Sequence, residues 1–192
     1  MDTSRLKQLA NQLRQKKEME TSMRVARKRQ LKMLQQPPEI PGYEFKNLYI
    51  PAAAVSGDFY DYIHVSPGKI GLTLGDVTGH GVEAGLVMGL AIGATSIFAL
   101  GRESPAEVLS CTNAHLAPRL GGDTFFSASY IIIDTNNHSM IVSRAGHEPP
   151  LLFNPQREPK LTPLAPNGMI IGVDQTNKRF STTIEELEVE LV

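Results

Sequence analysis

The chain has 192 residues, of which 41 % are hydrophobic, and its 19 Lys and Arg residues nearly balance its 20 Asp and Glu residues. A chain of this length buries about 70 % of its unfolded surface when it folds. It therefore needs neither a disulfide framework nor a structural zinc site, and a single cysteine excludes both. Cys111 lies in an apolar, helix-like stretch, which favours a buried, inert thiol over a nucleophile. No basic segment followed by an apolar run opens the chain, so we expect no secretory signal and a cytoplasmic location.

The charge is not spread evenly along the chain. Residues 1–36 contain 10 Lys and Arg against 3 Asp and Glu, which leaves 9 against 17 for residues 37–192. The first segment therefore carries +7 and the remainder carries −8.

Residues 1–36 contain no Gly or Pro and consist mainly of strong helix formers, so they predict one amphipathic helix that ends at Pro37. Apolar residues recur in it at steps of three and four, although Lys16 and Arg27 interrupt a strict heptad. This imperfect seam favours a linker or coiled-coil-like helix that joins an upstream sensor module or pairs with a second copy of the chain. Binding of nucleic acid or of a membrane surface through the basic face is the alternative.

From residue 37 the composition changes to alternating and β-branched segments without an internal repeat, which predicts one domain over residues 37–192. Strands are expected near 43–50, 58–65, 69–76, 125–134, 139–145, 150–154 and 183–191. Two helices fit between the third and fourth of these strands. The second helix begins at Ser104-Pro105-Ala106-Glu107, a capping box with proline at the first helical position.

The first of the two helices falls in residues 84–101, which contain no charged side chain. About 18 such residues are the lower limit for a membrane span. Glycines recur at every fourth position from residue 81 to residue 93, however, and a polar segment directly precedes the run. A helix that is apolar all round and has a bare glycine face is typical of a buried core helix, so no membrane insertion is expected.

Residues 56–81 predict a hairpin, because two strands flank the turn signal Ser66-Pro67-Gly68. If this triplet is a three-residue loop, Asp58 faces Asp76 across the hairpin. The even-numbered positions are the more apolar, so this side is expected to face the core, with both aspartates at its edge. Asp61 falls on the other side, where it is expected to be solvated or to support a ligand.

Two aspartates opposed in this way repel each other, because their Cβ atoms lie roughly 5 Å apart. Either one of them stays protonated, as in an acid–base dyad, or both ionise around a hard divalent cation. The cation is favoured, since the glycines of the following turn at residues 78–81 free the backbone to direct carbonyl groups at a metal. A loop one residue longer would separate the pair and leave two ordinary surface aspartates.

At these residues the chain resembles the bacterial PPM-type serine/threonine phosphatases of the SpoIIE-like, or RsbU-like, group. The matching segments occur in the family's order: 49–52 (Tyr-Ile-Pro-Ala), 57–61 (Gly-Asp-Phe-Tyr-Asp), 75–81 (Gly-Asp-Val-Thr-Gly-His-Gly), 145–150 (Ala-Gly-His-Glu-Pro-Pro) and 171–172 (Ile-Gly). Either aspartate motif alone would be a weak signal, but the two together are highly specific.

The resemblance implies an α+β fold, a four-layer α-β-β-α sandwich of two antiparallel sheets flanked by helices, preceded by the long N-terminal helix. It also implies two Mn²⁺ or Mg²⁺ ions held by Asp58, Asp76 and the backbone carbonyl of Val77, with a metal-bound water that attacks phosphorus directly. The implied substrate is phosphoserine or phosphothreonine on a signalling protein such as an anti-sigma-factor antagonist.

One departure from the family pattern limits this expectation. The family has further metal-binding aspartates in a Thr-Asp-Gly motif and an Asp-Asp pair, and neither occurs in this sequence. Residues 37–192 are therefore expected to form a phosphatase domain without its C-terminal part, with weak metal binding and low activity.

Two histidines near the motifs have alternative roles. His80 could donate a proton to the leaving oxygen, or be a polar loop residue before a helix. His147 could approach the site, or bond a backbone carbonyl in a turn.

The first functional hypothesis is a metal-dependent phosphoprotein phosphatase that is regulated through its N-terminal helix. The second is a catalytically weak or inactive interaction module with the same fold, and a nucleic-acid binder comes third.

Overall fold

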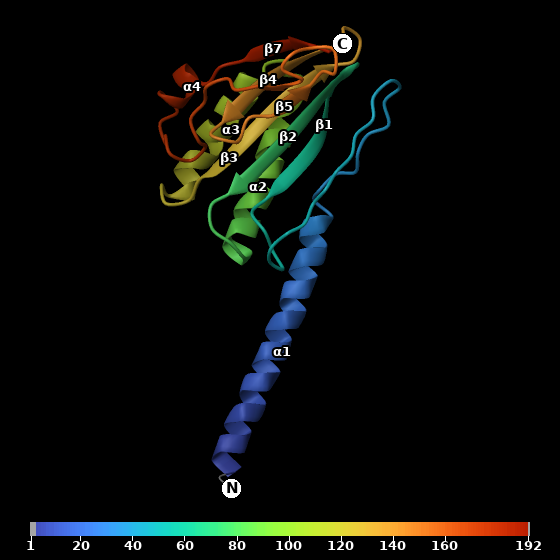
Figure 1. Cartoon of the computed structure of the whole chain (residues 1–192). Coiled ribbons are helices and arrows are strands. Elements are labelled where there is room, and N and C mark those ends of the chain that lie inside the picture. Colours follow the sequence, from blue (N-terminus) through green and yellow to red (C-terminus); the bar gives the residue numbers. More distant parts are fainter. Residues whose placement is uncertain (1–2, 192) are drawn as a thin grey trace.

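The computed structural model describes residues 3–191, in which one long helix extends away from a domain formed by the other elements (Figure 1). The helices are α1 (Thr3–Leu31), α2 (Val82–Ala99), α3 (Pro105–Leu120) and the short α4 (Phe180–Thr183). The strands are β1 (Phe59–Ser66), β2 (Lys69–Val77), β3 (Phe126–Asp134), β4 (Ser139–Ala145), β5 (Leu151–Phe153), β6 (Leu161–Pro163) and β7 (Leu187–Glu190).

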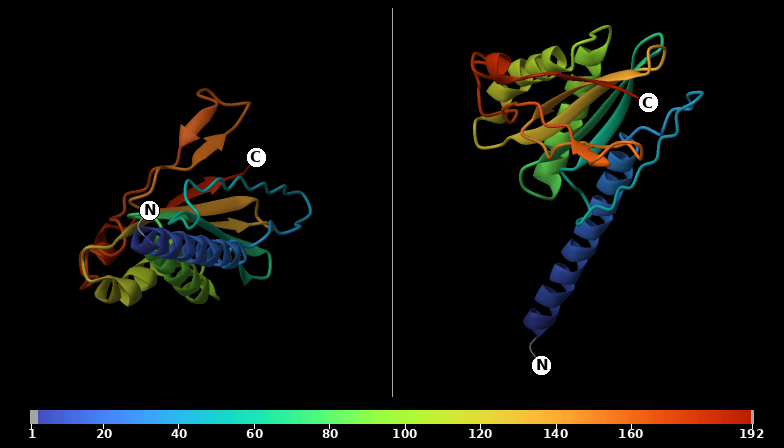
Figure 2. Two further views of the ribbon diagram at one scale, coloured as in Figure 1. Left: turned by 90° about the horizontal axis from the view of Figure 1, so that it is seen from below. Right: turned by 45° about the horizontal axis from the view of Figure 1, so that its top comes forward.

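The centre of the domain is an antiparallel five-stranded sheet in the order β1-β2-β3-β4-β7, and β5 pairs with β6 in a second, two-stranded antiparallel sheet. Helices α2 and α3 cover one face of the larger sheet, and the β5–β6 hairpin lies on its other side (Figure 2). The expected α+β class, with two antiparallel sheets, packed helices and a long N-terminal helix, is confirmed.

Most of the predicted strands exist. Those near 58–65, 69–76, 125–134, 139–145 and 150–154 correspond to β1 through β5, whereas the strand expected at 183–191 is β7 alone, preceded by the unpredicted α4. The strand expected at 43–50 is wrong, because only an isolated bridge between Ile40 and Tyr43 forms there. Aromatic side chains of this segment rest on the face of the sheet instead of extending its edge.

The register of the predicted hairpin is correct over most of its length. Tyr60 pairs with Leu74, and His64 pairs with Ile70, as a three-residue loop requires. Close to the turn a bulge shifts the register, so that Ser66 rather than Val65 pairs with Lys69. The bulge leaves the far end of the hairpin, where Asp58 and Asp76 lie, in the predicted register.

The side of the hairpin that faces the helices is the opposite of the one expected. The odd-numbered residues of β1 and β2 are buried under α2 and α3, together with Phe126 and Tyr130 of β3. Two glycines provide the space for aromatic rings on this side: a Cβ at Gly75 would lie 2.4 Å from the ring of Phe59, and one at Gly71 would lie 2.2 Å from the Tyr130 hydroxyl. A count of apolar side chains on each face of the hairpin does not identify the odd-numbered face as the buried one, because glycine contributes no side chain to the count.

The even-numbered residues form the outer face of the sheet. Here a smaller cluster is buried, with contributions from the segment around Phe45 and from Leu152. Its buried members are Ile70, Ile133, Met140, Val142 and Leu164. The cluster does not reach the far end of the hairpin, where Leu74 is 54 % exposed. Asp58 and Asp76 therefore lie at the open end of the outer face and not at the edge of the main core.

Helix α1 ends at Leu31, five residues earlier than predicted, in a turn that extends to Met33. Most of its described side chains are exposed, including Leu9, Leu13 and Met19. The end of the segment packs on the domain, most tightly through the buried Gln30 and Leu34 (Figure 1). Residues near the end of the predicted N-terminal segment 1–36 therefore pack on the domain.

Helix α2 is long and apolar enough to cross a membrane by length and composition alone, with a mean hydropathy of 1.7. In the structure it packs against β1, β2 and α3 through residues such as Met88 and Ala91, both fully buried. One face of α2 therefore belongs to the core, as predicted, whereas another apolar face, with Leu86, Leu90 and Ile97 each more than half exposed, is open to solvent. Cys111 on α3 is half-buried, less enclosed than expected.

Candidate metal centre

The two motif aspartates face each other at the open end of the β1–β2 hairpin. Phe59 pairs with Gly75, so the preceding Asp58 lies opposite Asp76. Partial burial, and then the negative charge of Asp58, raise the pKa of Asp76 above its usual value. Both residues are nevertheless exposed to solvent, so the site is open to ligands.

Asp58 is held by its neighbours in the chain. The Ser56 hydroxyl donates to Asp58 Oδ2 over 3.0 Å and accepts from the Asp58 N–H over 3.2 Å. The Tyr49 hydroxyl donates to the Asp58 carbonyl over 3.2 Å. These contacts give the carboxylate a defined orientation before any ligand binds. Tyr49 and Ser56, which both precede the motif in sequence, are thereby held beside it.

The backbone carbonyl of Val77 lies at the same end of the hairpin. A Cβ at Gly57 would approach the Val77 oxygen to 2.6 Å, so this close passage requires glycine immediately before Asp58. Glycine is therefore required for steric reasons at position 57, the first residue of the Gly-Asp-Phe-Tyr-Asp motif.

His147 is a site residue that the sequence did not assign. Its Nδ1 lies 2.7 Å from the hydroxyl of Ser127, and Ser127 pairs with Asp76 on the neighbouring strand. The pKa of His147 is lowered, chiefly by burial, although the carboxylates of Asp76 and Asp58 act in the opposite direction. Its partner is thus a side chain of β3 and not a turn carbonyl. The Ala-Gly-His motif was a usable signal, but its distance in the chain, 71 residues from Asp76 and 89 from Asp58, concealed the contact.

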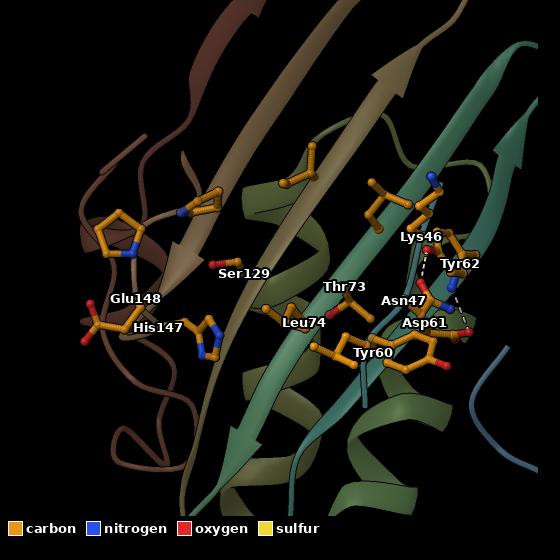
Figure 3. A pocket seen from close by; sticks show the side chains of 15 residues that line it. Lys46, Asn47, Tyr60, Asp61, Tyr62, Thr73, Leu74, Ser129, His147 and Glu148 are labelled. Carbon is orange, nitrogen blue, oxygen red and sulfur yellow. Dashed lines mark hydrogen bonds between the residues drawn. The ribbon is translucent and has the colours of Figure 1, made fainter. Parts of the chain in front are cut away.

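A groove on the outer face continues from this site. It has a volume of about 400 Å³ and runs between His147 at one end and Lys46 and Tyr62 at the other (Figure 3). Its floor consists of Tyr60, Leu72, Leu74 and Ile131.

His80 and Asp61 differ in their surroundings. His80 is exposed in the loop before α2, and its ring makes none of the hydrogen bonds found among residues 3–191. Asp61 is on the helix side of β1 and only 5 % exposed. It is therefore neither solvated nor in reach of the open end of the hairpin.

The donor set fits one side of a divalent-cation site. Two carboxylates and a backbone carbonyl are hard oxygen ligands of the kind that Mg²⁺ and Mn²⁺ prefer. Within the described part of the chain, however, no group of three or more His, Cys, Asp and Glu side chains gathers around them. Water or further ligands would have to complete the coordination.

The profile of one protein family, Stage II sporulation protein E (SpoIIE), matches residues 66–191, more than half of the chain. The chain belongs to the SpoIIE family. This confirms the resemblance deduced from the aspartate motifs.

Relatives of this SpoIIE-family chain share modest identity with it. IcfG from Synechocystis sp. is 25 % identical, over 61 % of this chain and 23 % of IcfG. The SiaA PP2C domain of Pseudomonas aeruginosa superposes with a TM-score of 0.70 at 20 % identity, over 92 % of this chain and 69 % of that one. The RsbU and RsbW domains of Rv1364c from Mycobacterium tuberculosis give 0.59 at 22 % identity, over 73 % and 37 %. The chain spans about a quarter of IcfG, and the solved structures establish a PP2C-type fold.

Proposed function

We propose that the chain is a metal-dependent phosphoprotein phosphatase that hydrolyses phosphoserine or phosphothreonine on a signalling protein. The observation that carries the proposal is the opposed pair Asp58 and Asp76 on an open face, in a chain of the SpoIIE family. Mutual repulsion makes such a pair unfavourable without a cation. A phosphate ester can reach it from solvent, because no described element covers the end of the hairpin.

Asp58, Asp76 and the Val77 carbonyl are the groups that would hold two Mn²⁺ or Mg²⁺ ions. When bound, such ions supply an activated water and neutralise the phosphoryl oxygens during in-line attack. Ser56 and Tyr49 hold Asp58 in place. His80, exposed in the loop after β2, is assigned the role of proton donor to the leaving serine oxygen.

The substrate proposed is a small phosphoprotein, specifically an anti-sigma-factor antagonist in a partner-switching pathway of the cytoplasm. Support comes from Rv1364c, whose solved structure contains RsbU and RsbW domains together. We further propose that a sensor module joined through α1 regulates the domain, since α1 projects from the domain close to the aspartate motif (Figure 1). Neither nucleic acid nor a membrane is included among the partners.

A second candidate is a phosphatase-fold interaction module with little or no turnover. It is favoured by the small donor set, since two carboxylates without a third clustered acidic or histidine side chain in residues 3–191 bind a cation weakly. Such a chain would bind a phosphoprotein and retain it.

Hydrolysis of p-nitrophenyl phosphate in graded Mn²⁺ separates the two candidates. We expect slow turnover that requires Mn²⁺ and falls more than about 100-fold in Asp76→Asn, because removing a direct ligand costs at least as much as removing a supporting residue. Asp123→Asn, at an exposed loop position, is the control and should be unaffected. Hydrolysis that is absent, or insensitive to both Mn²⁺ and Asp76→Asn, would leave the interaction module as the function.

A further inference from the structure

The end of helix α1 is hydrogen-bonded to the segment that carries Asp58. Gln30 is 5 % exposed, although most of α1 is open to solvent. Its side-chain Nε2 donates to the carbonyl of Ser56 over 2.7 Å, and its Oε1 accepts from the N–H of Ser56 over 3.1 Å. One amide side chain therefore satisfies both backbone groups of a single residue that lies 26 positions further along the chain.

Ser56 passes this constraint to the proposed metal ligand. Its hydroxyl both donates to Asp58 Oδ2 and accepts from the Asp58 N–H. The orientation of the carboxylate thus depends on where the Ser56 backbone lies. A donor and an acceptor about 3.6 Å apart no longer form a hydrogen bond, so a displacement of α1 by one or two ångströms would release Ser56.

Helix α2 leaves room for the contact between Gln30 and Ser56, because it has a glycine at position 85. A Cβ at Gly85 would lie 2.2 Å from Val55 Cγ1 and 3.1 Å from Gln30 Nε2. Val55, which is 6 % exposed, and Gln30 therefore occupy the position that a larger residue at 85 would take. The Gln30 amide also lies 3.6 Å from Met88 Sδ. The glycine face of α2 thus serves the junction between α1 and residues 55–58.

We propose that Gln30 is a positioning residue for the metal centre: through Ser56 it sets the orientation of the Asp58 carboxylate and so couples the position of α1 to cation affinity. This rests on the proposed function, in which Asp58 and Asp76 bind divalent cations. An amide is suited to the task, because it donates and accepts at once and leaves neither backbone group of Ser56 unsatisfied when α1 is docked. An undocked α1 leaves both groups without their partner.

The test is Mn²⁺ binding to the full chain, followed by electron paramagnetic resonance of the free ion, in wild type and Gln30→Met. Methionine keeps the length and the burial of the side chain but cannot bond to Ser56. We expect Mn²⁺ affinity to fall about tenfold, the lower end of the range for residues that orient metal ligands. Amide hydrogen exchange of residues 52–58, measured without metal, should become faster. Gln15→Met, at an exposed position of the same helix, should change neither quantity.

A double-mutant cycle shows whether Gln30 acts through Ser56. Ser56→Ala removes the hydroxyl that contacts Asp58, so adding Gln30→Met to it should cost little further affinity. Leu120→Ala, a core truncation on α3, controls for a general loss of stability. Unchanged affinity in Gln30→Met, or an equal loss in Leu120→Ala, would overturn the inference while leaving the metal site intact. Absence of Mn²⁺ binding in the wild type would overturn the proposed function and the inference together.

Discussion

Asp58, Asp61 and Asp76 lie on one hairpin but in different surroundings. Asp58 and Asp76 share the solvent-exposed outer face, whereas Asp61 is buried between β1 and α2. Asp61 accepts hydrogen bonds from the Ser96 hydroxyl over 2.6 Å and from the Tyr62 N–H over 2.9 Å, and it has no ion-pair partner in residues 3–191. Burial raises the pKa of Asp61 above its usual value. The two aspartates of the Gly-Asp-Phe-Tyr-Asp motif therefore lie in separate environments: Asp58, the proposed metal ligand, is on the exposed face, and Asp61 is inside the core.

The burial of Asp61 predicts a pH-dependent stability. Because its pKa is raised in the folded chain, the native state binds more protons than the unfolded state once pH exceeds the unfolded value of about 3.9, so the free energy of unfolding falls as pH rises. Asp61→Asn cannot lose a proton, and the variant should gain stability relative to wild type between pH 4 and neutrality. Urea unfolding at a series of pH values measures this difference. A constant difference across the series would contradict the assignment.

The opposed pair predicts opposite effects of one substitution with and without metal. In the metal-free chain Asp76→Asn removes like-charge repulsion and should stabilise the fold by a few tenths to about 1 kcal/mol. In excess Mn²⁺ the wild type gains about 2.7 kcal/mol at 100 times its dissociation constant, whereas the variant gains little. Thermal unfolding with Mn²⁺ and with EDTA provides both comparisons. A variant that is less stable than wild type in EDTA would show that the two carboxylates do not repel.

At the scale of elements, the glycines of α2 differ in what surrounds them. Gly85 packs against Val55 and Gln30, and a Cβ at Gly89 would lie 3.6 Å from Met33 Sδ, whereas a Cβ at Gly93 would have no neighbour within 4 Å. The glycine face of α2 is therefore covered at Gly85 and Gly89 by residue 55 and by the end of the segment that carries α1, and it is open at Gly93. The regular four-residue spacing of these glycines in the sequence does not show which of them are packed and which are open.

The difference predicts alanine substitutions of opposite sign. Gly93→Ala should stabilise the chain by about 0.5–1 kcal/mol, because alanine loses less backbone entropy in a helix. Gly85→Ala should destabilise it by about 1–3 kcal/mol, since the added methyl group overpacks the stiff, buried Val55. Equilibrium urea unfolding of the two variants checks the signs. Equal stabilisation by both would mean that Val55 does not pack on Gly85.

At the scale of the whole molecule, the near-zero net charge conceals two separated regions. The segment 1–36 carries +7 and the remainder −8, and α1 points away from the domain (Figure 1). Its exposed apolar residues, Leu9, Leu13 and Met19 among them, are not covered by any described element. Pairing with a second copy would bury them, at a cost in repulsion between the two basic helices.

This geometry predicts a dimer that depends on α1 and that is strengthened by salt, because added ions screen the repulsion between the helices. Light scattering should give a dimer for the full chain and a monomer after deletion of residues 1–22. That deletion spares Gln30 and Leu34, whose burial makes removal of residues 1–36 harmful to the fold. A monomer in both cases would exclude self-association through α1.

Local patterns account for the elements and for the site residues with strong signals. Alternation and turn residues predict β1 to β5, and Ser104 caps α3 by accepting from the Glu107 N–H, although Glu107 bonds to Arg102 and does not complete the capping box. The strand expected at 43–50 failed, because its aromatic residues are equally suited to lying across a sheet. The contacts of His147 and Gln30 could not be predicted from local patterns, since their partners lie 20 and 26 residues away in the chain.

The sequence by itself determined the α+β class, the hairpin register and the opposition of Asp58 and Asp76, because all three follow from interactions between near neighbours in the chain. Only the tertiary structure decided which face of the hairpin is covered, where Asp61 lies, and that α1 contacts the segment before Asp58. Those outcomes depend on the space left by Gly71, Gly75 and Gly85. Which side chains fill the space beside a glycine depends on residues far away in the chain, so the sequence pattern around the glycine does not predict it.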